Sequence, residues 1–140
     1  MLSLSEAIKE EFQFSLQKAE YNRIDAPAEG VSTDIELKVK DSLIVTEISN
    51  ETLCFQVVRS LFFQPANLYS ITVVIDAVLS FKDGFVRAPE QDKAFWCDLL
   101  KTQGANITGN LLSRTSMIIS NILAAMGHIP VITPPSLIDE

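Results

Sequence analysis

Residues 52–81, TLCFQVVRSLFFQPANLYSITVVIDAVLSF, contain the pattern that decides the fold. Two segments rich in β-branched and aromatic residues, 52–63 and 68–81, flank the short stretch 64–67. Such side chains favour extended backbone, whereas proline and asparagine favour turns. A connection this short joins antiparallel neighbours. The stretch therefore predicts two antiparallel strands.

The part of the chain before this pair also alternates with a period of two residues. Residues 12–24 and 35–48 both alternate apolar with polar side chains, which predicts two further strands. The stretch 25–30 separates them, because its proline and glycine interrupt a strand. A change of phase near Asp41 and Ser42 indicates a bulge. We therefore expect four antiparallel strands between about residues 12 and 81.

The second half of the chain changes to a helical period. Polar residues after Pro89 favour a first helical turn and Gly104 ends it, which predicts a helix over about residues 89–103. Apolar residues at three- and four-residue spacing predict a longer helix over about 108–126, with Gly127 as its C-cap. Residues 128–140 contain three prolines and should lie extended against the fold.

These elements predict one α+β domain over residues 1–140, with the two helices packed on one face of a four-stranded antiparallel sheet. The composition indicates more apolar surface than one small core hides, since 47% of the residues are hydrophobic and eight are Phe. A monomer of this length buries only about 70% of its unfolded surface. We therefore expect a subunit interface, an exposed apolar groove, or both.

Charge and cysteine content exclude several partners and compartments. The net charge of −7 argues against nucleic acid or an anionic membrane as partner, because either would repel the protein. The sequence shows no secretion signal and no apolar stretch near the roughly 20 residues that span a bilayer. Two cysteines, Cys54 and Cys97, are then best explained as free thiols. We expect a cytoplasmic protein.

Residues that carry catalysis or hold metals are sparse. The single histidine, His128, and the two separated cysteines offer no metal-ligand spacing, and the five glycines form no phosphate loop. A Cys97–His128 dyad and Asp76, in the middle of an apolar strand, are the remaining candidates for chemistry. Packing or surface roles explain each of them more simply. We therefore expect no enzyme, no cofactor and no metal.

Aromatic and methionine side chains supply the candidates for a binding surface. They gather near the end of the predicted sheet, in the loop after it, and on the helices, where methionine adds an adaptable side chain. The candidates for polypeptide binding are Phe62, Phe63, Phe81, Phe85, Phe95, Trp96 and Met117. Any one of them is more often a core residue, and Phe85, in the loop, is the clearest exception.

The order of elements and several short motifs resemble the SecB family of export chaperones. IDAP at residues 24–27 resembles the end of that family's first strand, and IELKV at 35–39 resembles its second. Asn106-Ile107 resembles the start of its long helix, and TPPSLID at 133–139 resembles its extended tail. The resemblance implies a homotetramer, a dimer of dimers, that holds unfolded or precursor polypeptides in hydrophobic grooves without ATP.

The resemblance gives less support to coupling with the SecA motor. Members that serve SecA present an acidic patch on the outer sheet, where Asp25 fits one position and Glu20 lies nearby. Thr72 stands where a further acid is expected, and the sequence stops soon after its proline-rich segment. A SecB-like chaperone with other clients, for example a toxin–antitoxin component, is at least as well supported as a SecA-linked one.

Two other classes of function remain open. A specific adaptor or immunity-type protein would bind one folded partner tightly and ignore unfolded chains. An enzyme acting on a small ligand or an acyl thioester would need an acid or base in a pocket, and Asp76, Cys97 or His128 would carry its activity.

Overall fold

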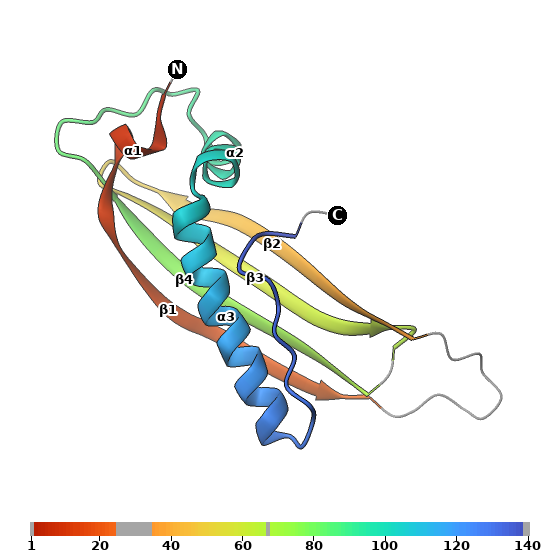
Figure 1. Ribbon diagram of the computed structural model, residues 1–140. Helices are drawn as coiled ribbons and strands as arrows, with labels where there is room; N and C mark the ends of the chain where they lie inside the picture. Colours follow the sequence, from red (N-terminus) through yellow and green to blue (C-terminus); the bar gives the residue numbers. More distant parts are fainter. Residues whose placement is uncertain (1, 25–34, 67, 139–140) are drawn as a thin grey trace.

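The computed structural model describes residues 2–24, 35–66 and 68–138. It confirms the α+β class: a four-stranded antiparallel sheet is followed by helices that lie against one of its faces (Figure 1). In chain order the elements are α1 (Leu4–Ala7), β1 (Ile8–Arg23), β2 (Glu36–Ile48), β3 (Thr52–Gln64), β4 (Tyr69–Phe81), α2 (Lys93–Gln103) and α3 (Ala105–Ala125).

The strands form one sheet in the order β1-β4-β3-β2. The predicted antiparallel pair, β3 and β4, occupies its centre, and β1 and β2 lie outside them. Positions in β4 alternate between buried and half-buried along the whole strand, and β3 does the same up to Leu61. This alternation arises because successive side chains point to opposite faces and the helices cover only one face. We call these the covered face and the open face.

Three segments lie on the covered face. The long helix α3 crosses the sheet over β4 and β3, and α2 packs against β2. Residues 128–138 begin at His128, which contacts Tyr21 of β1 near the end of α3. They then turn back beside α3 and run along the face on the side of the helix away from β1 (Figure 1). We call residues 128–138 the tail. Its Val131 and Leu137 pack against the core.

The helix α2 begins at Lys93, four residues later than the sequence pattern predicts. Residues 88–91 form a turn instead, because the Gln91 side chain accepts a hydrogen bond from the backbone N–H of Ala88 (2.9 Å). Asp92 then caps the helix by accepting from the backbone N–H of Phe95 (3.0 Å). The polar residues expected in the first turn therefore lie before it.

A single residue, Gly104, joins α2 to α3, so α3 begins three residues before its predicted start. A Cβ atom on Gly104 would lie 2.6 Å from the carbonyl oxygen of Leu100, and only glycine fits there. At the far end of α3, Gly127 has a φ of +84°, the left-handed conformation that commonly ends a helix.

The bulge predicted at Asp41 and Ser42 is absent, and the register of β2 shifts between Val45 and Glu47 instead. Asp41 faces the covered side of the sheet directly opposite Arg59 of β3. The two side chains are 1% and 0% exposed, and Arg59 Nη2 lies 2.7 Å from Asp41 Oδ2. Asp41 therefore occupies a position of β2 that points to the covered face, where an apolar residue is expected. In the sequence its charge looks like an interruption of the alternation between apolar and polar residues.

Candidate polypeptide-binding surface

An exposed apolar surface lies between β1 and α3. Phe14 and Leu16 of β1 are 40% and 53% exposed, although both point to the covered face, and Met117 of α3 is 65% exposed. With their neighbours these residues line a hollow of about 220 Å³. We call its lining the β1–α3 patch: Phe14, Leu16, Ile75, Arg114, Met117 and Ile118.

The patch exists because β1 lies one strand beyond the part of the sheet that α3 covers. Phe14 and Leu16 pair with Ala77 and Ile75 of β4, which are only 1% and 2% exposed. The β4 residues lie beneath the helix α3. Their β1 neighbours lie beside α3, which covers them on one side and leaves the other side in solvent. Apolar side chains on the covered face of β1 therefore remain in contact with solvent.

A cation shapes one end of the patch. The guanidinium carbon of Arg114 lies 4.3 Å from the centre of the Phe14 ring, a cation–π contact. Arg114 Nε also donates to Asn110 Oδ1 at 2.9 Å, which fixes the side chain along α3. The patch thus presents apolar surface with a positive charge at its border.

The patch adjoins an edge of the sheet. Within the described residues β1, 16 residues long, pairs only with β4, so its other side carries backbone N–H and C=O groups open to a partner. An exposed edge of this kind can accept an extended peptide as an additional strand. Backbone pairing groups and apolar surface consequently lie next to each other.

Only Met117, of the seven residues predicted to bind polypeptide, lies in the β1–α3 patch. Trp96 is 0% exposed and donates its Nε1–H to the carbonyl of Gln91 (3.1 Å). Phe81 is also buried, and its ring stacks on Phe85 with centroids 5.3 Å apart. Burial places Trp96 and Phe81 in the core, out of reach of a ligand in this structure.

The rings of Phe81, Phe85, Phe95 and Trp96 form one aromatic cluster. Their contacting centroids are 5.2 to 6.0 Å apart. Phe85 and Phe95 are half-buried at its border, and Phe95 lines a small apolar hollow beside Leu2. The sequence thus grouped these four residues correctly, and two of them retain exposed surface.

Phe62 and Phe63 lie at the other end of the sheet, where β3 ends and β4 begins. Phe63 packs edge-on against Tyr69, with centroids 5.1 Å apart, and Phe62 pairs with Ser70 on the open face. The structure therefore does not join these two residues to the aromatic cluster.

The open face carries the residue considered for partner docking. Glu20 lies opposite Thr72. Hydrogen bonds from Lys18 (2.7 Å) and Asn22 (3.0 Å), with the charge of Lys18, hold the pKa of Glu20 below its usual value. The second docking candidate, Asp25, lies outside the described residues. Glu20 is accordingly an exposed carboxylate that already has a cationic neighbour.

The residues named for an enzymatic alternative lie apart. Asp76 is half-buried on the open face. Cys97 donates to the carbonyl of Leu43 (3.3 Å) beneath α2, and His128 Nε2 lies 2.6 Å from the Tyr21 hydroxyl oxygen. In the described part of the chain, no three His, Cys, Asp or Glu residues gather as metal ligands would. The structure does not assemble these residues into one site.

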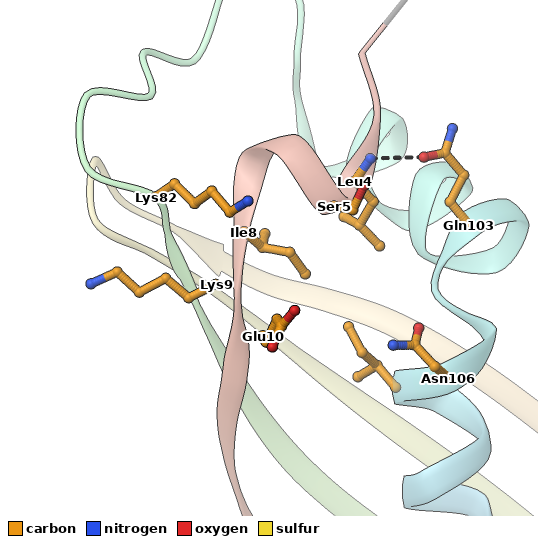
Figure 2. A pocket seen from close by; sticks show the side chains of 9 residues that line it. Leu4, Ser5, Ile8, Lys9, Glu10, Lys82, Gln103 and Asn106 are labelled. Atoms are coloured by element: carbon orange, nitrogen blue, oxygen red, sulfur yellow. Dashed lines mark hydrogen bonds between the residues drawn. The ribbon is translucent and has the colours of Figure 1, made fainter.

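A further pocket, of about 370 Å³, lies where α1, the ends of β1 and β4, and the start of α3 meet (Figure 2). Leu4 and Ile8 contribute apolar surface, and Lys82, Glu10 and Asn106 surround it (Figure 2). Its lining contains neither histidine nor cysteine.

None of the described helices combines the length and hydrophobicity required to span a membrane.

Two solved structures share this fold. The structure is similar to the SecB-like chaperone of Mycobacterium tuberculosis in complex with a ChAD peptide from the HigA1 antitoxin, with a TM-score of 0.59 and 9% identity over 90% of this chain and 83% of that one. It is also similar to a protein of unknown function from Streptococcus agalactiae, with a TM-score of 0.50 and 11% identity over 91% and 98% of the two chains.

No protein-family model and no curated protein matches the sequence. At these low identities the structural similarity shows the fold alone. The prediction of a SecB-like fold, made from the order of elements and short motifs, is confirmed.

Proposed function

We propose that this protein is an ATP-independent chaperone that holds unfolded or precursor polypeptides in an extended form. The observation that carries the proposal is the β1–α3 patch beside the free side of β1. An extended client would pair its backbone with this edge. Its side chains on one face, every second residue, would then contact the patch.

The chemistry of the patch suits clients of varied sequence. Burial of apolar surface contributes about 25 cal/mol per Å² without directional requirements. Met117 adapts its shape to different partners, and the Arg114 stem adds apolar surface below its charge. The net charge of −7 keeps such a surface soluble and attracts basic clients.

We also propose that the protein works in the cytoplasm as a homo-oligomer, a tetramer built as a dimer of dimers. The exposed apolar residues of β1 favour assembly, because monomers rarely leave such surfaces open. In such an assembly part of the patch would be covered and the rest would line a groove between subunits. A SecA-linked export role has weaker support, because Thr72 faces Glu20 and Lys18 already neutralises that carboxylate.

Charge substitutions in the patch test this proposal. Leu16→Asp should lower the potency of aggregation suppression at least about tenfold, because it places a charge where apolar client groups must be buried. Gln13→Asp, on the open face of the same strand and opposite Val78, is the matched control and should behave as wild type. Light scattering by a reduced, unfolded client measures suppression, and size-exclusion chromatography with light scattering measures the oligomer.

Three outcomes decide the matter. Full suppression by Leu16→Asp would remove the patch from the proposal, and loss of suppression in Phe85→Asp alone would move the site to the aromatic cluster. A wild-type monomer that suppresses no aggregation would end the chaperone proposal as a whole.

A dedicated adaptor is the second candidate. The M. tuberculosis neighbour binds a peptide from an antitoxin, which favours a protein with one client, such as a toxin–antitoxin component, and no SecA role. The two candidates differ in range: a general chaperone protects many unfolded proteins at similar concentrations, whereas an adaptor binds one segment and leaves the others to aggregate.

A further inference from the structure

A buried arginine holds the tail against the sheet. A guanidinium group has five N–H donors, and every donor of Arg59 has an acceptor. Two are the carboxylate oxygens of Asp41, both at 2.7 Å. The other three belong to the tail: the Thr133 hydroxyl (2.9 Å) and the carbonyls of Pro134 and Ser136. The tail therefore supplies most of the acceptors that this buried cation requires.

Two more side chains complete the contact. Asp41 Oδ2 accepts from the backbone N–H of Ile138 (2.8 Å). Ser116 of α3 accepts from the backbone N–H of Thr133 and donates to its carbonyl, both at 3.0 Å. We call Arg59, Asp41 and Ser116 the clamp.

The clamp recognises backbone groups at alternating positions. The carbonyls of Pro134 and Ser136 and the N–H of Ile138 are spaced by two residues, and the chain bends at residues 135 and 136 between them. The Thr133 hydroxyl is the one side-chain group of the tail that takes part. Prolines fit at 134 and 135, where the clamp uses no N–H, but not at 133 or 138, where it does. The clamp consequently binds backbone groups of the tail more than its side chains.

The tail supplies acceptors to the clamp, and Val131 and Leu137 add apolar contacts with the core. Removal of the tail would take away the acceptors of three Arg59 donors, and water or another segment would have to replace them. Between α3 and the clamp, however, Ile129 and Ile132 are 87% and 88% exposed. Another segment could supply the same carbonyls.

We propose that the clamp is a second peptide-binding site, which takes a segment of a client polypeptide in exchange for residues 133–138. The ligand offers two carbonyls spaced by two residues and an N–H two residues further on. Residues 133–138 lie on the side of α3 away from β1 (Figure 1), so this site is separate from the β1–α3 patch.

Peptide exchange on the full chain tests this site. The probe is a labelled peptide with the sequence of residues 128–138, HIPVITPPSLI, and fluorescence anisotropy measures its binding. Ile138→Pro in the protein removes the N–H that Asp41 accepts and keeps all three clamp residues. This variant should bind the probe about tenfold more tightly than wild type, because its own tail competes less well.

Two altered peptides serve as controls. A peptide with alanine in place of Pro134 should bind the Ile138→Pro protein as the probe does, because only the carbonyl at that position is used. A peptide with proline in place of Ile138 should bind at least about tenfold more weakly. Leu16→Asp should leave the difference in probe binding between wild type and Ile138→Pro unchanged, so that failure of the patch and failure of the clamp are distinguishable.

Circular dichroism first establishes that Ile138→Pro is folded. A folded variant that binds no probe, or that binds both altered peptides equally, overturns the proposal. A dimer formed by exchange of tails between copies, stable to excess probe in light scattering, would make a second copy the occupant and would also overturn it.

Discussion

The outer strand β1 and the central strands β3 and β4 belong to one sheet but differ in how far they are covered. The inward residues of β4 are all buried, whereas β1 has exposed residues along most of its length. The difference is sharpest between cross-strand neighbours: Leu16 is 53% exposed and its partner Ile75 is 2% exposed. The central strands therefore stabilise the fold, whereas β1, one of the two edge strands, keeps apolar side chains in contact with solvent.

The largest effect on the free energy of unfolding is expected from a substitution in the central strands. Arg59→Ala should lower the free energy of unfolding by about 3–5 kcal/mol, because it leaves the Asp41 carboxylate buried without its partner. Urea unfolding followed by circular dichroism measures the loss. A double variant, Arg59→Met with Asp41→Leu, should lose less than the single variant. A loss below about 1 kcal/mol in Arg59→Ala would contradict the role assigned to this pair.

Two alanine substitutions, one in β4 and one in β1, test the difference in burial between these strands. Ile75→Ala should cost about 2–5 kcal/mol, as is usual for truncation of a buried aliphatic side chain. Leu16→Ala, one strand away on the same face, should cost about 0.5 kcal/mol or less, because its side chain is already half in water. Both are measured by urea unfolding at one protein concentration. Equal losses would show that β1 is covered in solution, by a second copy or otherwise.

The smallest effect concerns Tyr69, at the start of β4. Burial, with a smaller contribution from Tyr21 of β1, raises the pKa of Tyr69 above its usual value of 10.0. The folded state thus favours the neutral phenol, so this contribution to stability is complete below about pH 10. It is lost as the pH rises further. Wild type and Tyr69→Phe should therefore diverge in unfolding free energy only above that pH, and parallel curves to pH 11 would contradict this.

Local patterns were sufficient for the fold class and for the presence of four strands, although β1 begins at Ile8, four residues before its predicted start. The alternation in residues 52–81 depends on neighbours along the chain, and β3 and β4 follow it. Asp41 was misinterpreted because its partner, Arg59, lies 18 residues away and a charge at an inward position resembles a break. The start of α2 was placed too early because Gln91 closes a turn there through its side chain.

The patch depends on where α3 crosses the sheet, which periodicity does not determine. Phe14 and Leu16 show the alternation of an ordinary half-buried strand, and their exposure follows from the path of the helix. One local signal did exist: Met117 falls outside the buried stripe of α3 formed by Leu111, Leu112, Thr115 and Ile119. Trp96 and Phe81 lacked any such signal, because an inward aromatic residue and a ligand-binding one have the same sequence pattern.

The tail has a consequence for the order of events during synthesis. Arg59 leaves the ribosome 74 residues before Thr133, and 77 before Ser136. Until those residues emerge, the hairpin of β3 and β4 carries a guanidinium group with only part of its hydrogen bonds satisfied. Water must take the place of the missing acceptors until then, and the burial of Arg59 is completed only when residues 133–136 dock.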